Sequence, residues 1–150
     1  HTRSSCVTGV QTCALPTSNM HLCKNGNRLV VSQYRYQSNQ SYNYTFEYSN
    51  GQWSEIDELL VWDFQKAGIN YPFMSCQSVL SDDGMRLAFA YQVKGEIYIY
   101  DWVNGAWSQI ATLNDYNLVP GVIQGGFFST SSFGNTMEFS GDGNTLAIIS

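Results

Sequence analysis

The stretch DGMRLAFA, residues 83–90, decides the fold because the chain contains it in three versions. The other two read NGNRLVVS over residues 25–32 and DGNTLAII over residues 142–149. The glycine of each version lies 58 or 59 residues from the glycine of the next. A period of this length indicates an architecture of stacked supersecondary units, each too small to bury its own apolar face.

A second repeated motif lies between these stretches. NGQWSEI, residues 50–56, recurs 54 positions later as NGAWSQI, residues 104–110, with five of seven residues identical. An Asn-Gly pair supplies the two positive φ angles that a type I′ hairpin needs. We therefore expect a tight hairpin at each site, with Trp53 and Trp107 opening the strand that follows.

Each complete repeat is expected to contain four short antiparallel strands. The residues after each glycine form apolar runs of strand length, which is typical of a strand covered on both faces. Aromatic residues then alternate with others over residues 44–48 and 98–102, and a period of two indicates a strand. The Trp-initiated segment supplies another strand. The segments before the glycine turns supply the remaining strand of each repeat, at residues 20–22, 75–80 and 136–140.

Four strands repeated about every 58 residues predict an all-β chain, a β-propeller fragment made of four-stranded antiparallel blades. The expected divisions are blade repeat 1 at residues 17–72, blade repeat 2 at residues 73–132, and the truncated start of blade repeat 3 at residues 133–150. Blades are apolar on both faces, which suits a composition of 43% hydrophobic and only 13% charged residues. Residues 55–68 could form a short helix, but we interpret them as an inter-blade connection.

The first sixteen residues show neither strand alternation nor an apolar helical face. Residues 7–16, VTGVQTCALP, resemble the translation of a sequencing-library adaptor, so residues 1–16 are predicted to be non-native. Without them, 6 basic and 12 acidic residues give a net charge of −6, and only Cys23 and Cys76 remain. Two cysteines support neither a disulfide framework nor a zinc site, and whether they pair stays open.

A family resemblance rests on three phrases. SDDGMRLA at residues 81–88, SGDGNTLA at residues 140–147 and GEIYIY at residues 95–100 resemble the FG-GAP-type repeats of integrin-α-like propellers. Phe133-Gly134 ahead of SGDGNTLA adds to the similarity, which covers residues 17–150. The resemblance implies a non-catalytic adhesion or binding module, extracellular or at the cell surface, that recognises a protein or glycan.

The Asp-Gly turns are candidate metal sites. Asp82, Asp83 and Asp142 could offer carboxylates to Ca²⁺, which takes about six to eight oxygen ligands. The calcium-binding form of the resembled repeat carries D-x-D-x-D-G, whereas these loops read SDDG, SGDG and CKNG. We favour the alternative that these residues only shape the turn, and we expect no cofactor.

Aromatic residues in the predicted rim loops are the candidate ligand-binding residues, because flat rings bury area at a low entropic cost. The predicted loop over residues 33–43 holds three of them, and the inter-blade loops hold the others. For the three tyrosines of that loop a packing role remains an open alternative. The candidates are Tyr34, Tyr36, Tyr42, Asp63 and Tyr116. Trp62, Phe127 and Phe128 are instead expected to act as wedges between blades.

Catalysis has little support in the sequence. His21 lies in a predicted strand, where a structural role is favoured, and no nucleophile-elbow, P-loop, Rossmann or zinc-protease motif occurs. One alternative is a glycoside-active propeller enzyme, with Asp63 and Asp115 as a carboxylate pair and its other catalytic residues largely outside this chain. Another is an intracellular WD-repeat-like scaffold, although the period exceeds the about 40–45 residues of that repeat.

Composition and charge also limit the classes of partner that the chain could bind. An aromatic-rich, mildly acidic chain is neither a disordered segment nor a basic nucleic-acid-binding domain. No apolar run approaches the roughly 18 residues of a membrane helix, so we expect no membrane insertion of this segment. The expected partners are a protein or glycan ligand and the remaining blades of the same propeller.

Overall fold

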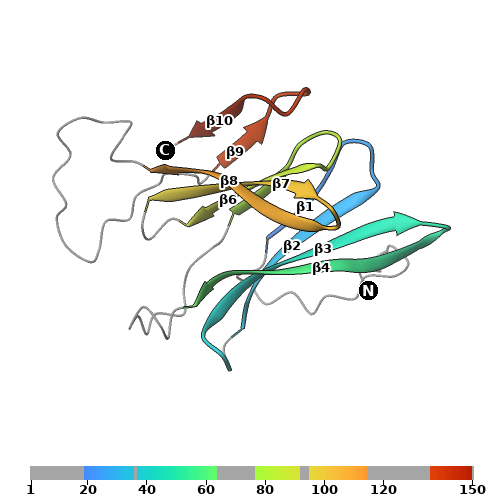
Figure 1. Ribbon diagram of the computed structural model, residues 1–150, viewed down its shortest axis with the longest axis horizontal. Helices are drawn as coiled ribbons and strands as arrows, with labels where there is room; N and C mark the ends of the chain where they lie inside the picture. Colours follow the sequence, from blue (N-terminus) through green and yellow to red (C-terminus); the bar gives the residue numbers. More distant parts are fainter. Residues whose placement is uncertain (1–18, 36, 64–76, 92–94, 115–135, 150) are drawn as a thin grey trace, which may run out of the picture.

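The computed structural model of the chain describes residues 19–35, 37–63, 77–91, 95–114 and 136–149. Within these ranges the chain forms ten β-strands in three antiparallel sheets and contains no helix (Figure 1). The all-β prediction is confirmed. The described ranges consequently hold no helical segment with the length and apolar character needed to cross a membrane.

Both complete repeats form a four-stranded meander, as the sequence predicts, and the third repeat contributes two strands. The first sheet contains β1 (Asn19–Leu22), β2 (Arg28–Arg35), β3 (Gln40–Ser49) and β4 (Gln52–Asp63). The second contains β5 (Gln77–Leu80), β6 (Arg86–Tyr91), β7 (Glu96–Val103) and β8 (Ala106–Asn114). The third contains β9 (Thr136–Phe139) and β10 (Leu146–Ile149).

The Asn-Gly hairpins have the expected geometry. Asn50 and Gly51 have φ angles of 52° and 80°, and Asn104 and Gly105 have 54° and 83°. Positive φ at both central residues matches the right-handed twist of the flanking strands. The turns therefore fix the register of β3 with β4 and of β7 with β8.

Two predictions about loops are wrong. Residues 33–43 are not a loop, because β2 continues to Arg35 and β3 begins at Gln40. Residues 55–63 are not a connection but most of β4, which pairs with β3 as far as Asp63, and Trp62 also lies in this strand. Continuous ladder bonds satisfy the backbone of these polar segments, and β-bulges absorb the register shifts. Residues 64–68 lie outside the described ranges.

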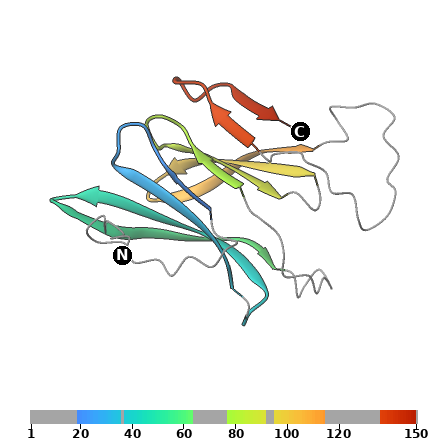
Figure 2. The same ribbon diagram turned by 180° about the vertical axis from the view of Figure 1, so that it is seen from behind.

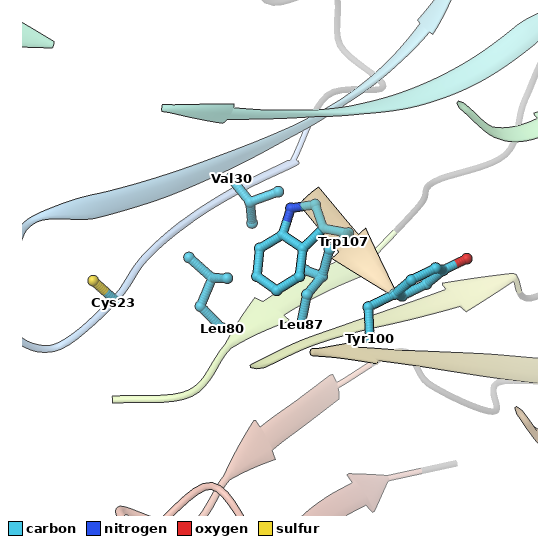
Figure 3. Packing of buried hydrophobic residues seen from close by; sticks show 6 residues of the cluster. All are labelled: Cys23, Val30, Leu80, Leu87, Tyr100 and Trp107. Atoms are coloured by element: carbon cyan, nitrogen blue, oxygen red, sulfur yellow. The ribbon is translucent and has the colours of Figure 1, made fainter. Parts of the chain in front are cut away.

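The three sheets stack face to face (Figures 1 and 2). Between the first and second sheets, Val30 packs with Leu80, Leu87 and Trp107, together with Cys23 and Tyr100 (Figure 3). Between the second and third sheets, the buried residues are Val79, Ala88, Ala90, Ile97 and Phe139. Alternate residues of one strand therefore serve opposite interfaces, and the run Leu87 to Ala90 is fully buried, as its continuous apolar character predicts.

The two interfaces differ in chemistry. The Ser32 and Ser78 hydroxyls lie within hydrogen-bonding distance of each other across the first interface and of Asn43 Oδ1, at 2.7 and 3.1 Å, so their two hydrogens are shared among these three contacts. The corresponding part of the second interface is apolar, with Ala90 and Ile97. A buried hydroxyl that loses its partner costs free energy, so the first interface depends on matched residues in both sheets.

The sheets approach most closely along their first strands. β5 contacts β1 on one side and β9 on the other, whereas β4 and β8 touch only slightly. The described sheets therefore converge on β1, β5 and β9 and splay apart toward their last strands. The same strand order places the three glycine turns on one side of the stack.

Candidate functional site

The second glycine turn shows how its carboxylate is used. Asp83 Oδ1 accepts hydrogen bonds from Ser81 Oγ at 2.6 Å and from the Met85 N–H at 2.9 Å. Ser81 Oγ in turn accepts from the Arg86 N–H at 2.9 Å. The Ser81 hydroxyl, followed by the Met85 N–H, lowers the pKa of Asp83 below its ordinary value. Asp83 thus stabilises its own turn.

The third turn repeats this arrangement. Asp142 Oδ1 accepts from Ser140 Oγ at 2.6 Å and from the Asn144 N–H at 3.1 Å. The Ser140 hydroxyl is the main cause of a lowered pKa at Asp142. The geometry is therefore common to the two Asp-Gly turns rather than particular to one of them.

The first turn has the same design with different atoms. Cys23 Sγ stands where the other turns have a serine hydroxyl, donates to Asn25 Oδ1 at 2.8 Å, and accepts from the Arg28 N–H at 3.2 Å. Sequence reasoning missed this role of Cys23. Aligning position 23 with Ser81 and Ser140 at the repeat period would have revealed it.

The third candidate metal residue, Asp82, lies in the second turn and contacts the first turn. Its Oδ2 pairs with Lys24 Nζ at 3.0 Å, and its carbonyl accepts from the Asn25 N–H at 3.4 Å. The three candidate carboxylates are thus divided between two turns. Across the described part of the chain, no group of three or more His, Cys, Asp and Glu residues could hold a metal ion. The expectation of no cofactor stays a prediction.

Arginines connect each turn to the next. Arg28 donates to the Gly84 carbonyl at 2.9 Å, and Arg86 donates to the Gly143 carbonyl at 2.8 Å. Each also pairs with an acid of its own sheet, Arg28 with Glu47 at 2.8 Å and Arg86 with Asp101 at 2.6 and 3.0 Å. These charge-assisted bonds tie the turn of one sheet to the turn of the next.

Two turn glycines also permit close approach. A Cβ on Gly84, whose φ is +72°, would lie 3.0 Å from Arg28 Cβ and 3.3 Å from Cys23 Sγ. A Cβ on Gly143, whose φ is +69°, would lie 3.2 Å from Ser81 Cβ. Glycine is therefore needed there both for the backbone conformation and for contact with the preceding turn.

A polar cluster with an aromatic centre lies at the opposite end of the first sheet; we call it the tyrosine rim, comprising Arg35, Gln40, Tyr42, Glu58 and Asp63. The Arg35 guanidinium carbon lies 4.1 Å from the Tyr42 ring centroid, and Arg35 pairs with Glu58 at 3.0 Å. The Tyr42 hydroxyl donates to Gln40 Oε1 at 2.8 Å, and Gln40 Nε2 donates to Asp63 Oδ2 at 2.9 Å. Hydrogen bonds thus connect two predicted site residues, Tyr42 and Asp63, through Gln40.

Tyr34 lies on the other face of the sheet. β2 and β3 pair without a bulge, with Tyr34 opposite Ser41 and Tyr42 opposite Gln33, so the two tyrosines point in opposite directions. Tyr34 is only 7% exposed, and its hydroxyl donates to Asn39 Oδ1. This burial favours the packing role. The predictions at Tyr36, Tyr116, Asp115, Phe127 and Phe128 fall outside the described ranges.

His21 joins the first two sheets. Its Nδ1 accepts a hydrogen bond from the Leu80 N–H at 3.1 Å, so the neutral ring carries its proton on Nε2. Burial lowers the pKa of His21, and the nearby Glu138 carboxylate partly opposes this shift. A cleft of about 230 Å³ beside it is lined by residues that include Lys24, Asp82 and Glu138. The geometry fits the structural role expected of His21.

Comparison of the chain with protein-family models, with curated proteins and with solved structures gives no match. The site and the fold therefore stand on the chain's own geometry.

Proposed function

We propose that this chain is a section of a β-propeller and serves as a non-catalytic binding module of a secreted or cell-surface protein. The support for the propeller is the stack itself. Four-stranded antiparallel meanders pack face to face and converge on their first strands, as blades do around an axis. The repeat period and the resemblance to FG-GAP-type repeats point to the same architecture.

The ligand-binding part of the proposal rests on the tyrosine rim. Arg35, Gln40 and Asp63 are held by hydrogen bonds or ion pairs beside a partly exposed tyrosine ring. Planar polar groups next to an aromatic ring suit the hydroxyl-rich, half-apolar surface of a sugar, and they also suit polar loops of a protein. A glycan is the favoured ligand, because the rim offers several fixed polar groups and only a small apolar area.

The test is a binding screen on immobilised glycans with the intact chain, followed by substitution. Tyr42→Ala and Asp63→Asn should each reduce binding at least about tenfold, since both remove fixed contacts at the rim. Tyr48→Ala is the matched control, because Tyr48 lies in the same strand near its other end and is 45% exposed. Tyr34→Ala is unsuitable, since removing a buried aromatic ring destabilises the fold by about 3–5 kcal/mol and would confuse a loss of structure with a loss of contact.

Three outcomes would contradict the proposal: no glycan bound, binding that Tyr42→Ala leaves unchanged, or an equal loss with Tyr48→Ala. Circular dichroism of each variant separates a loss of contact from a loss of structure. If a protein ligand binds instead, and Tyr42→Ala and Asp63→Asn weaken its binding while Tyr48→Ala does not, the tyrosine rim is still the binding site but its ligand is a protein and not a glycan.

A further inference from the structure

The chain contains two acceptor sequences for N-linked glycosylation, each an asparagine followed two positions later by serine or threonine. They are Asn39-Gln40-Ser41 and Asn43-Tyr44-Thr45. The two asparagines are four positions apart, but Asn39 is the last residue of the turn between β2 and β3, whereas Asn43 lies inside β3. An N-linked glycan is bulky and needs open space at its asparagine, so the structure can distinguish between the two positions.

Asn39 lies at an open end of the first sheet. Its φ of 52° is the left-handed conformation of a turn, and the residue is partly exposed. The end of β2 and the start of β3 project beyond the second sheet (Figures 1 and 2). Stacking covers the faces of a sheet and not the ends of its strands, so further repeats would leave Asn39 accessible.

The hydrogen bond that Asn39 makes is compatible with this modification. The Tyr34 hydroxyl donates to Asn39 Oδ1. Glycosylation replaces one hydrogen on Asn39 Nδ2 and leaves Oδ1 as a carbonyl acceptor. The glycosylated residue therefore keeps the bond that connects the turn to β2.

Asn43 is in the opposite situation, because it is fully buried between the first and second sheets. Its Oδ1 lies 2.7 Å from Ser32 Oγ and 3.1 Å from Ser78 Oγ. Its Nδ2, the atom that a sugar would be attached to, is buried as well. A glycan on Asn43 would have to occupy the space of the second sheet, so a chain that carries one cannot form the first interface.

The hydroxyl residues of both acceptor sequences are buried, which indicates when a sugar is added. Ser41 and Thr45 are 1% and 0% exposed, and Thr45 Oγ1 also accepts the Trp107 indole N–H. The acceptor sequence is defined by this hydroxyl, so an enzyme that reads it must act before β3 pairs with its neighbours. Folding then decides which glycosylated asparagine is tolerated.

We propose that Asn39 carries an N-linked glycan in the folded, secreted chain and that Asn43 does not. The donor is an oligosaccharide linked through a diphosphate to a polyprenyl lipid, in a eukaryotic secretory pathway. A bond forms between Asn39 Nδ2 and C1 of the first sugar, and the bond between C1 and the phosphate oxygen breaks. The lipid diphosphate leaves, and Nδ2 releases one proton to solvent. The inference rests on the secreted location in the proposed function and not on the tyrosine rim.

The test is expression of the intact chain in mammalian cells behind a cleavable signal peptide. Enzymatic release of the glycans in ¹⁸O water leaves a labelled aspartate at each occupied position, which peptide mass spectrometry locates. We expect the label at Asn39 and not at Asn43 in the secreted chain.

Substitution checks the assignment by the electrophoretic mobility of the secreted chain. Asn39→Asp should lose the mass of one glycan, and aspartate keeps an acceptor for the Tyr34 hydroxyl and tolerates a positive φ. Asn50→Asp is the matched control and should keep the glycan. Asn50 also has a φ of 52° in a turn, but it begins no acceptor sequence.

Three results would overturn the inference: an unmodified Asn39 in the secreted chain, a glycan on Asn43 there, or an Asn39→Asp chain that migrates like the parent. If little chain is secreted, the protease-resistant fraction inside the cells serves as the folded sample for the same measurements. A glycan on Asn43 is expected only in the protease-sensitive fraction. The glycan-binding screen uses chain made in bacteria, without N-linked glycans, so a failure of the tyrosine rim and a failure at Asn39 are observed separately.

Discussion

Trp107 donates its indole N–H to Thr45 Oγ1 at 2.7 Å, joining the last strand of the second sheet to the third strand of the first. Both residues are buried, and Trp107 belongs to the cluster that includes Val30 and Leu87. The tryptophan that the sequence identifies as the start of a hairpin strand is thus also a link between sheets. It combines a large apolar area with a directional bond.

Trp107→Phe should destabilise the chain by about 1–3 kcal/mol, because it leaves the buried Thr45 hydroxyl without its donor and removes apolar area. Urea denaturation followed by circular dichroism measures the change. Trp53→Phe, at the equivalent position of the first repeat, is the control and should cost less, since Trp53 is only partly buried. Equal costs at the two sites would refute the inter-sheet role of the indole.

Substitution of the turn glycines separates backbone strain from contact between turns. Alanine in a left-handed conformation costs about 1–2 kcal/mol, and Gly26 and Gly84 both have positive φ. Space around Gly26 is open, whereas a Cβ on Gly84 meets Arg28 Cβ at 3.0 Å. Gly84→Ala should therefore lower the unfolding free energy by clearly more than Gly26→Ala. Matching losses in chemical denaturation would show that the turns do not constrain each other.

Cys23 should be replaceable by serine but not by alanine. Ser81 and Ser140 already make the same pair of bonds in the other turns, so Cys23→Ser should keep the melting temperature near that of the parent. Cys23→Ala leaves the Arg28 N–H without its side-chain acceptor and should cost about 1–3 kcal/mol. A serine variant as unstable as the alanine variant would mean that sulfur packing, not hydrogen bonding, is what the first turn needs.

His21 should make stability depend on pH. Burial lowers its pKa in the folded chain, so below pH 6.5, its ordinary value, the unfolded chain takes up the proton more readily. The neutral ring makes its full contribution to the unfolding free energy above pH 6.5. This contribution is lost as the pH falls from 6.5 to the lower pKa that His21 has in the folded chain. Protonation would also place a hydrogen on Nδ1, facing the Leu80 N–H. Glu138, which raises the pKa, limits the effect.

The measurement is urea denaturation of the parent and of His21→Gln at several pH values between 5 and 8. The difference in unfolding free energy between the two should shrink as the pH falls below 6.5. A difference that stays constant over this range would show that the bond to Leu80 does not depend on the charge of the ring. Comparison with the variant cancels the titration of the groups that do not interact with His21.

Calcium should leave the melting temperature unchanged. Asp83 and Asp142 already accept hydrogen bonds from their own turns, and Asp82 pairs with Lys24. A ligand that binds the folded state raises stability in proportion to the logarithm of its excess over the dissociation constant. Thermal melts with a millimolar excess of Ca²⁺, with Mg²⁺ as control, test this. A clear rise with Ca²⁺ alone would reverse the preference for a turn role.

Local patterns were enough to predict most of the strands. The Asn-Gly hairpins depend on two adjacent residues. The continuous apolar run over residues 87–90 indicates a buried strand, and the alternating aromatic residues over 98–102 indicate a strand with two different faces. The ends of β2, β3 and β4 could not be predicted in this way. Gln33, Gln40 and Glu58 belong to no apolar pattern, and they lie in strands because the backbone ladder continues past the hydrophobic residues.

The candidate site could be predicted only in part, for a related reason. Tyr42 and Asp63 stand out by residue type, but the glutamine and arginine that fix them are ordinary polar residues until β3 pairs with both neighbours. Tyr34 and Tyr42 lie on opposite faces of the sheet because of the register of β2 with β3. A prediction that treats residues 33–43 as a loop contains no register and cannot separate the two residues. Arg28 and Arg86 follow the turn in two of the three repeats. Their bonds to the Gly84 and Gly143 carbonyls could not be predicted from the sequence, because these bonds join one sheet to the next.

The contrast between the two interfaces has a consequence for the order of the repeats. At the repeat period, Met137 of the third sheet corresponds to Ser78 of the second. If the third sheet packed on the first, Asn43 and Ser32 would face a thioether instead of the hydroxyl that now bonds to both. The second and third sheets are therefore not interchangeable as packing partners of the first sheet. The residues on the buried faces of the repeats thus determine which repeat packs against which.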